Sequence, residues 1–273
     1  MNSILIPDNL KDYLICEDCS DFNVNNYFKT ARTEEIKEEI IRTKEKSDII
    51  QNIIKKSYPN TTLLYGPAGT GKTTFSRYLA HELNMPFIYV NFAKIFSGIF
   101  GKTTSVINEI FEFVWDKECI FMLDEIDCIS QERGRESDGA TGGEISRVTI
   151  TLMQCFDMLR SKKSPLILIS ATNRVDIMDK ALRSRFSIVK EVPTLTSEEK
   201  NNFILKFLTD INEKLKENNM TTLRYNHQNI QDYCTRGSRI SQRNVEMDIM
   251  RNLAKWLDNT NEEFLLDHIK EEL

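Results

Sequence analysis

The sequence lacks any hydrophobic run long enough to cross a membrane. Its longest apolar runs, such as Cys119–Leu123 and Pro165–Ile169, are far short of the roughly 18 residues that suggest a membrane-spanning helix. The N-terminus also lacks a basic stretch followed by an apolar core, so it does not resemble a signal peptide. We therefore expect a cytoplasmic protein with no membrane partner.

The sequence has no excess of positive charge. Its 36 lysines and arginines are outnumbered by 41 aspartates and glutamates, which gives a formal net charge of −5. A protein that binds nucleic acid through bulk charge neutralises many phosphates with basic side chains. The charge balance therefore argues against nucleic acid as the main partner.

Cysteine is scarce and scattered. The six cysteines lie in segments that resemble strands and helices, as expected for reduced thiols in the cytosol. Cys16 and Cys19 form one C-x-x-C pair, and no second pair follows at a useful spacing. A structural zinc ion needs four ligands, so this half-site is weak evidence and leaves metal binding open.

The strongest pattern is a glycine-rich loop at residues 66–73, Gly-Pro-Ala-Gly-Thr-Gly-Lys-Thr, which fits G-x-x-x-x-G-K-[ST]. A short apolar strand at 62–65 precedes it, and a helical pattern at 74–83 follows. Such a loop and helix N-terminus form a cradle of N–H groups for phosphate. We expect Lys72 to reach the β- and γ-phosphates and Thr73 to hold Mg²⁺. A glycine-rich turn that binds nothing is disfavoured, because loop, lysine, hydroxyl, strand and helix coincide.

The rest of the chain first alternates strands with helices. Residues 1–30 are polar and resemble an extended arm or a poorly formed element, and 33–56 resemble a helix. The predicted strands are 62–65, 87–91, 119–123, 166–170 and 188–192; the further helices are 74–83, 104–116 and 144–160, with a glycine-rich loop at 131–143. This alternation predicts a parallel sheet covered by helices on both faces.

From about Thr194 the pattern becomes helical only. Helices are predicted near 197–218, 226–235, 240–257 and 260–271. The change of pattern predicts a small all-helical second domain.

Polar side chains follow two of the predicted strands. The third strand ends with Asp124 and Glu125, and Asn173 follows the fourth. Ligands of open α/β sheets bind at the carboxyl ends of the strands. We expect Asp124 to hold Mg²⁺ through water, Glu125 to polarise the attacking water, and Asn173 to touch the γ-phosphate. A merely solvent-exposed acidic strand end would be favoured in isolation, but the phosphate loop makes the catalytic interpretation stronger.

Two arginines, Arg183 and Arg185, lie close together downstream. Phosphoryl transfer needs positive charge on the developing equatorial oxygens. An arginine from a neighbouring subunit would supply it.

Four motifs together carry a resemblance to a known family. GPAGTGKT at 66–73, IFMLDEID at 120–127, SATNR at 170–174 and DKALRSRF at 179–186 stand in the order found in AAA+ ATPases of the AAA type. The chain resembles this family over roughly residues 33–258.

The resemblance implies an α/β fold. It implies a three-layer P-loop NTPase α/β domain with a parallel five-stranded sheet at 33–193, and a small all-helical AAA+ lid domain at 194–273. Residues 1–32 would be an N-terminal arm.

The resemblance also implies roles for single residues. Asn173 matches the sensor-1 position, and Arg185 matches an arginine finger better than Arg183, although the family's segment is longer here and which arginine dominates stays open. Arg243 resembles sensor 2, with a surface arginine as the alternative. The implied nucleotide-binding residues are Gly66, Pro67, Ala68, Gly69, Thr70, Gly71, Lys72, Thr73, Thr74, Asp124 and Arg243.

A pore loop is implied at Ile99, Phe100 and Gly101. The family commonly has an aromatic where this sequence has Ile99, and Phe100 stands next to it. Grip on a protein client is one interpretation and a core position for Phe100 is the other. The loop at 131–143 matches a second pore loop.

The implied function is Mg²⁺-dependent ATP hydrolysis at the subunit interfaces of a homo-oligomeric ring, a hexamer, that remodels, unfolds or disassembles a protein client. A nucleic-acid-directed AAA+ ATPase of the clamp-loader or helicase-loader type is the first alternative. The second is a nucleotide-dependent assembly switch, which Glu125 argues against because such switches often lack that base. The client, adaptor and any partner protease are not encoded in recognisable form.

Overall fold

The computed structural model of the 273-residue chain describes six stretches of residues: 4–24, 27–55, 58–96, 102–128, 140–236 and 240–267. The chain divides into two units. The first contains Met1–Gly66 and Lys72–Val192, and the second contains Pro67–Gly71 and Pro193–Leu273. None of the helices in the described stretches is long and apolar enough to cross a membrane.

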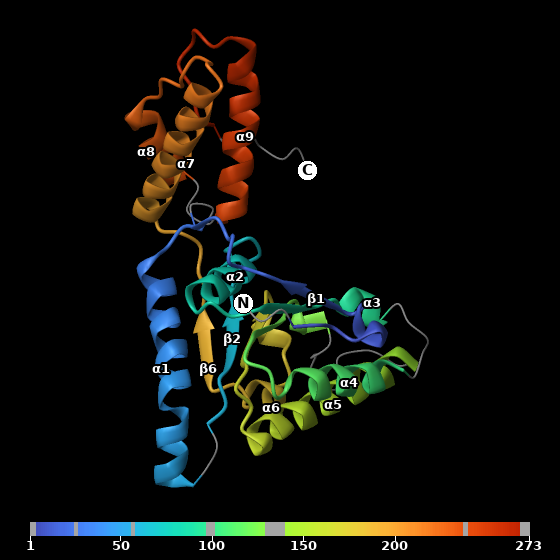
Figure 1. The fold of residues 1–273 in the computed structure, drawn as a ribbon. Coiled ribbons are helices and arrows are strands. Elements are labelled where there is room, and N and C mark those ends of the chain that lie inside the picture. Colours follow the sequence, from blue (N-terminus) through green and yellow to red (C-terminus); the bar gives the residue numbers. More distant parts are fainter. Residues whose placement is uncertain are drawn as a thin grey trace. The chain divides into compact units, whose positions relative to one another are not determined.

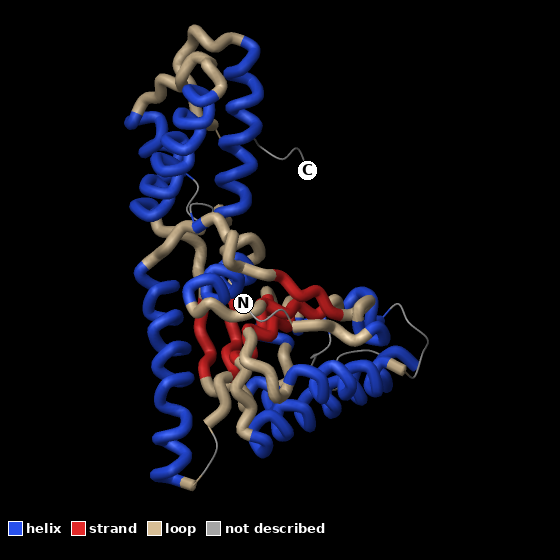
Figure 2. Tube along the Cα trace, in the orientation of Figure 1, coloured by secondary structure: helices blue, strands red, loops and turns tan. Residues whose placement is uncertain are grey.

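A six-stranded sheet organises the first unit (Figures 1 and 2). Its strands are β1 (Leu14–Glu17), β2 (Thr61–Tyr65), β3 (Phe87–Val90), β4 (Ile120–Leu123), β5 (Ile167–Thr172) and β6 (Ile188–Glu191), in the spatial order β1-β3-β4-β5-β2-β6. Strands β3, β4, β5, β2 and β6 are parallel neighbours, and β1 pairs with β3 in the antiparallel sense. The predicted parallel five-stranded sheet is confirmed, with one additional edge strand.

Helices cover both faces of this sheet. They are α1 (Ala31–Ile54), α2 (Lys72–Glu82), α3 (Phe92–Phe96), α4 (Thr103–Val114), α5 (Ala140–Lys162) and α6 (Lys180–Arg183). Successive strand residues point to opposite faces. One apolar cluster contains Leu63, Phe121 and Leu168 with residues of α4 and α5, and the other contains Leu64, Met122 and Ile169 with residues of α1 and α2. The predicted three layers are thus observed.

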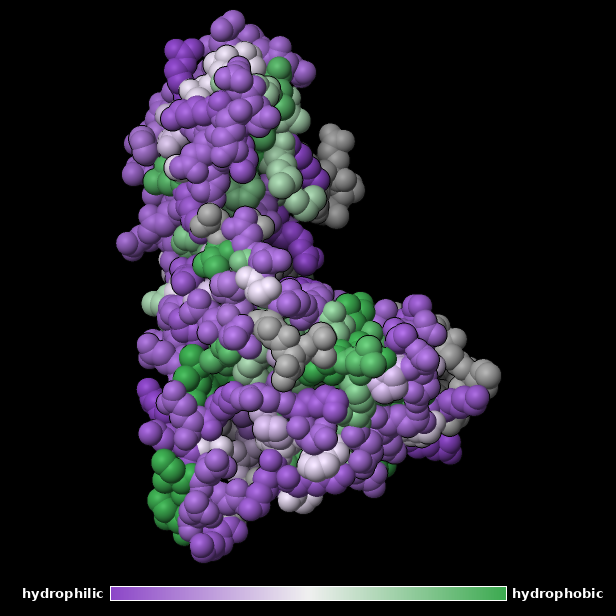
Figure 3. All heavy atoms as spheres, viewed as in Figure 1, coloured by the Kyte–Doolittle hydropathy of each residue, from purple (hydrophilic) through white to green (hydrophobic). Residues whose placement is uncertain are grey.

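Helix α1 begins with a reciprocal cap and ends in solvent. The Thr30 hydroxyl accepts from the Thr33 N–H, and the Thr33 hydroxyl accepts from the Thr30 N–H, which satisfies helix-start donors. Toward its C-terminal end, Ile49, Ile53 and Ile54 are exposed, and Figure 3 shows apolar surface at that end of the helix. The apolar stripe of α1 therefore contributes to the core mainly through its first half.

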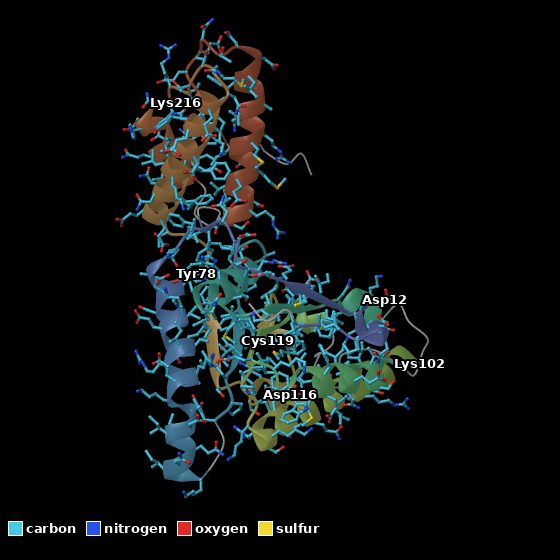
Figure 4. All side chains as sticks on the ribbon, viewed as in Figure 1. Asp12, Tyr78, Lys102, Asp116, Cys119 and Lys216 are labelled. Carbon is cyan, nitrogen blue, oxygen red and sulfur yellow. The ribbon has the colours of Figure 1, made fainter. Side chains whose placement is uncertain are left out.

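The expectation of an extended arm at residues 1–30 was wrong where the structure describes this segment. It contains a short 3-10 helix, η1 (Asp8–Leu10), and the edge strand β1. Glu17 accepts two hydrogen bonds from Arg77 of α2, at 2.6 and 2.9 Å. The Tyr27 ring stacks on Tyr78, labelled in Figure 4, with 4.5 Å between ring centroids. The segment is polar in composition, but Leu10, Leu14, Cys19 and Tyr27 are buried, so it folds onto the first unit through these residues.

The described residues of the second unit form the helices α7 (Ser197–Glu217), α8 (His227–Arg236) and α9 (Gln242–Asp258). Their apolar stripes form a core of their own, with Ile204, Ile230 and Ile249 fully buried or nearly so. The Tyr233 hydroxyl donates to Asp248 Oδ2 at 2.7 Å inside this core. The helical character of this part of the chain is as predicted.

Two local predictions were wrong. Residues 260–267 are not helical, whereas 260–271 were expected to be; 268–271 lie outside the described residues. Phe264 and Leu266 are buried while Leu265 is exposed, a period of two that suits an extended segment. Helix α5 also begins at Ala140, inside the predicted loop at 131–143, of which 131–139 lie outside the described residues.

Candidate functional site

The ends of three neighbouring strands bring the predicted polar residues together. Strand β5 lies between β4 and β2, and all three run in the same direction. Gly66 follows β2, Asp124 follows β4 and Asn173 follows β5. The Gly66 N–H donates to the Thr172 carbonyl at 3.3 Å, which extends the pairing past the end of β2. The carboxyl edge of the sheet is therefore where the candidate site lies.

Lys72 links two of these strand ends. It is the first residue of α2, and only 7% of it is exposed. Its ammonium group donates to the Gly66 carbonyl at 2.8 Å and to Asn173 Oδ1 at 2.9 Å. These two bonds tie the ammonium group to the ends of β2 and β5, so they place a positive charge at the carboxyl edge of the sheet.

Thr73 and Asp124 form an oxygen pair beside Lys72. The Thr73 hydroxyl donates to Asp124 Oδ2 at 2.6 Å, and the Glu125 N–H donates to Asp124 Oδ1 at 2.9 Å. Hydroxyl and carboxylate oxygens are the ligands that Mg²⁺ prefers. The pair thus fits a divalent cation next to a bound phosphate chain.

Glu125 projects from a strained turn. Its φ of 51° lies in the left-handed region, and its side chain is exposed, whereas the next residue, Ile126, is fully buried. A non-glycine residue in this region costs on the order of 1 kcal/mol or more. The turn holds the Glu125 carboxylate in solvent while Ile126 anchors the backbone.

Asn173 is also exposed and lies next to a buried threonine. The Thr172 hydroxyl donates to Asp127 Oδ1 at 2.8 Å and accepts from the Arg174 N–H at 2.9 Å. Thr172 and Asp127 are not among the predicted site residues. Their sequence positions could have indicated a role, since each lies within two residues of a predicted catalytic side chain.

The glycine-rich loop needs its glycines. Gly66 has a φ of 145°, and a Cβ there would lie 2.3 Å from the Val192 carbonyl oxygen. Gly69 has a φ of 74°, and within the second unit a Cβ there would lie 2.9 Å from Arg243 Cβ. In the same unit the Arg243 N–H donates to the Gly69 carbonyl at 3.2 Å. Larger residues at 66 and 69 would change the loop backbone.

These residues fit a magnesium nucleotide. The loop backbone is free of Cβ atoms at its tightest points, the Lys72 ammonium is poised at its end, and the Thr73–Asp124 pair supplies hard oxygen ligands. When bound, Mg²⁺ would neutralise charge on the phosphate oxygens.

A protein-family comparison agrees with this geometry. The model of the "ATPase family associated with various cellular activities (AAA)" matches residues 62–194, which include every strand-end residue described above. Residues 62–194 therefore form a domain of the AAA family of ATPases.

Curated relatives cover part of the chain that contains this AAA domain. It is 40% identical over 144 residues to a proteasome-activating nucleotidase of Thermococcus onnurineus, covering 50% of this chain and 34% of the relative. It is 35% identical over 125 residues to 26S proteasome regulatory subunit 8 of Dictyostelium discoideum, covering 45% of this chain and 31% of the relative. The matched region spans about a third of the length of these two relatives.

A solved structure has the same fold. The crystal structure of the FIGL-1 AAA domain aligns with a TM-score of 0.66 at 16% identity, covering 96% of this chain and 86% of that one. At this identity the likeness concerns the fold alone.

The two candidate arginines of this AAA domain differ in environment. Arg183 is exposed at the end of α6. Arg185 donates to the Ala181 carbonyl at 2.8 Å and to Asp157 Oδ2 at 3.1 Å. Phe186 packs edge-on against Phe156 at 4.9 Å and fixes the segment to α5. The structure therefore presents Arg183 to solvent and holds Arg185 against its own chain.

The remaining predicted site residues include several that the structure does not describe. Ile99, Phe100 and Gly101 of the predicted pore loop lie outside the described residues, as do residues 131–139 of the predicted second pore loop.

The cysteine pair at the N-terminus shows no metal cluster. A search of the described residues finds no group of three or more His, Cys, Asp or Glu side chains that could hold a metal ion. Burial raises the pKa of the Cys19 thiol to about 11, and burial also raises the pKa of Cys16.

Proposed function

We propose that this chain hydrolyses ATP with Mg²⁺ in a homo-oligomeric ring, and that it uses this energy to remodel a protein client. The observation that carries the proposal is the cluster at the sheet edge. There Lys72 contacts both the phosphate loop and Asn173, and Thr73 contacts Asp124. Positive charge, a cation site and a polar side chain for the γ-phosphate are thus gathered in one place.

Each residue takes one role in this proposal. Residues 66–74 hold the phosphates, with Lys72 on the β- and γ-phosphates. Thr73 and Asp124 hold Mg²⁺. Glu125 orients the attacking water and accepts its proton, which its exposed position allows. Asn173 detects the γ-phosphate, and its bond to Lys72 keeps its side chain directed at that site.

Two roles involve other parts of the assembly. Arg243 contacts nucleotide phosphate from the helical part of the chain, which we propose as a lid spanning 194–273. An arginine of a neighbouring copy completes the site, either Arg185 by its place in the motif or Arg183 by its exposure. We propose six copies in the ring, as the family resemblance implies. The α/β domain would span 33–193 and follow the N-terminal segment 1–32.

A protein client is favoured over nucleic acid. The relatives named above are called proteasome regulators or activators, and the net charge of −5 argues against a phosphate-tracking surface. We propose the cytoplasm as the location, because the scattered cysteines suit a compartment that keeps thiols reduced. The predicted pore residues Ile99 and Phe100 remain our proposal for the grip on the client.

The decisive experiment measures ATPase rate against protein concentration for the wild type and Glu125→Gln, with particle mass followed by light scattering. We expect specific activity to rise as a ring of about six copies assembles, since a shared site exists only between subunits. Glu125→Gln should bind ATP but hydrolyse it at least about 100-fold more slowly. Full activity in a verified monomer would overturn the shared site, and normal turnover by Glu125→Gln would overturn its role as base.

A further inference from the structure

A single hydrogen bond joins the turn that carries Glu125 to the strand end that carries Asn173. The Thr172 hydroxyl donates to Asp127 Oδ1 at 2.8 Å. Asp127 belongs to the 3-10 helix η3 (Ile126–Cys128), and Thr172 is the last residue of β5. Thr172 is only 1% exposed and Asp127 is half-buried, so this bond is partly shielded from water.

The bond lies where the backbone pairing of these two strands has ended. The last paired residues of β4 and β5 are Leu123 and Ser170. Beyond them the chain after β4 turns into η3, and β5 continues beside β2 as far as Thr172. The Thr172–Asp127 bond therefore continues, through side chains, a connection that the sheet no longer provides.

The same threonine also fixes the backbone around Asn173. Its hydroxyl accepts from the Arg174 N–H at 2.9 Å, so the residues on both sides of Asn173 are tied together. On the other segment, Glu125 lies between Asp124, which accepts from its N–H, and the buried Ile126. Thr172 directly precedes Asn173, and Asp127 lies two residues after Glu125, so the bond connects the two segments that carry the catalytic candidates.

We propose that Thr172 and Asp127 are positioning residues that set the spacing between Glu125 and Asn173. The proposal rests on the ATPase function proposed above. Water attack requires the base and the γ-phosphate contact to keep one geometry, and a displacement of about 1 Å can cost about 100-fold in rate. The bond acts on the chemical step. The phosphate loop contacts Thr172 through the Thr172 carbonyl, which side-chain substitutions at position 172 keep.

The test compares two pairs of variants. Thr172→Val removes the hydroxyl at constant shape, and Thr172→Ser restores it. Asp127→Ala removes the acceptor, and Asp127→Asn keeps an oxygen that accepts from Thr172. Single-turnover hydrolysis and the Kd for a fluorescent ATP analogue are measured for each. Thr151→Val is the matched control. In the wild type the buried Thr151 hydroxyl donates to the Arg147 carbonyl within α5, so this substitution removes a hydroxyl that takes no part in the Thr172–Asp127 bond.

We expect Thr172→Val and Asp127→Ala to lower the hydrolysis rate by about 10- to 100-fold, with Kd changed by less than about threefold. Thr172→Ser, Asp127→Asn and Thr151→Val should stay close to the wild type. The double variant Thr172→Val/Asp127→Ala should be no slower than the slower single variant, since both remove the same bond.

Several results would overturn the proposal. A normal rate in Thr172→Val, additive losses in the double variant, or an equal loss in Asp127→Asn and Asp127→Ala would each do so. The last result would show that the carboxylate charge, and not the bond, matters. If Thr172→Val does not fold, as judged by its melting curve, the comparison of Asp127→Ala with Asp127→Asn decides.

A second measurement separates this proposal from the ATPase proposal. Hydrogen exchange of segments 123–128 and 171–175 requires no turnover. Thr172→Val and Asp127→Ala should speed exchange in both segments, and Thr151→Val in neither. If the wild-type protein has no ATPase activity but the variants still show this exchange pattern, the enzyme proposal is overturned and the structural link between the two segments is retained. Unchanged exchange would overturn the link.

Discussion

The Thr73 hydroxyl donates a 2.6 Å hydrogen bond to Asp124 Oδ2 and so joins the start of α2 to the end of β4. Both oxygens are ligand types for Mg²⁺, so the pair predicts how metal dependence will respond to substitution. Asp124→Asn should raise the Mg²⁺ concentration for half-maximal ATPase by about tenfold or more, because a charged ligand is lost. Thr73→Ser, which keeps the hydroxyl, should titrate as the wild type does. An unchanged Mg²⁺ titration of Asp124→Asn would remove Asp124 from the cation site.

A mixing experiment can test whether Arg183 or Arg185, which lie in different environments, acts on a neighbouring copy. The alanine variant of the arginine that completes the neighbouring site should lose at least about 100-fold in turnover, because positive charge on the transferred phosphoryl group is lost, and the other variant should keep most of its turnover. If the arginine acts on a neighbouring copy, mixing the inactive variant with Lys72→Ala should restore activity, because each supplies what the other lacks. Verified mixed rings without recovery would contradict a role between subunits.

Asp157→Ala is the control for Arg185, since it breaks the ion pair and leaves the arginine in place. We expect it to keep most of the turnover and to lose about 0–1 kcal/mol of stability, as half-exposed ion pairs usually do. If Asp157→Ala were as inactive as Arg185→Ala, the function of Arg185 would be to hold its own chain together.

Gly66→Ala should destabilise the fold. Its φ of 145° is strained for any L side chain, and the new Cβ would lie 2.3 Å from the Val192 carbonyl oxygen. We expect a loss of at least about 2 kcal/mol in the free energy of unfolding, measured in urea. Gly143→Ala is the matched control, because a Cβ there meets nothing within 4 Å and the residue lies in α5. It should be neutral or stabilising by up to about 1 kcal/mol. Equal stability of the two variants would refute the steric argument.

The burial of Lys200 predicts how the free energy of unfolding depends on pH. It is only 1% exposed, its ammonium donates to the Cys234 carbonyl at 3.2 Å, and burial lowers its pKa below the usual 10.5. The native state therefore binds fewer protons than the unfolded state between the lowered pKa and 10.5, and stability from this residue rises with pH across that interval. The slope is at most about 1.4 kcal/mol per pH unit.

Urea unfolding of the wild type and Lys200→Met at several pH values between 7 and 10 isolates this contribution. The wild type should gain stability relative to the variant as pH rises, while the titrations of groups that do not interact with Lys200 cancel. A difference that stays constant with pH would mean that folding leaves the pKa of Lys200 unchanged.

The parts of the fold that follow local rules could be predicted from the sequence. The glycine-rich loop, its lysine and its threonine form a contiguous pattern, and the buried strands are short apolar runs that end in polar residues. Strand β1 could not be predicted, because four residues of mixed polarity pair with β3 far along the chain. The extended segment around Phe264 was mistaken for a helix, because charged residues near it suit either structure.

The contacts within the candidate site depend on tertiary structure. The bond between Thr172 and Asp127 joins residues 45 positions apart, and no local spacing indicates it. Likewise, the sequence places Arg183 and Arg185 side by side as equivalents. Only the fold shows that Asp157, on a different helix, holds one of them.

Strand β1 has a practical consequence for anyone who shortens this chain. It covers the edge of β3, whose residues Phe87–Val90 would otherwise offer unpaired backbone groups on an apolar strand. Uncapped edges of this kind recruit strands from other molecules and lead to aggregation. A truncated chain that starts at α1 should therefore precipitate or form strand-exchanged aggregates during expression, although every residue of the candidate site would still be present.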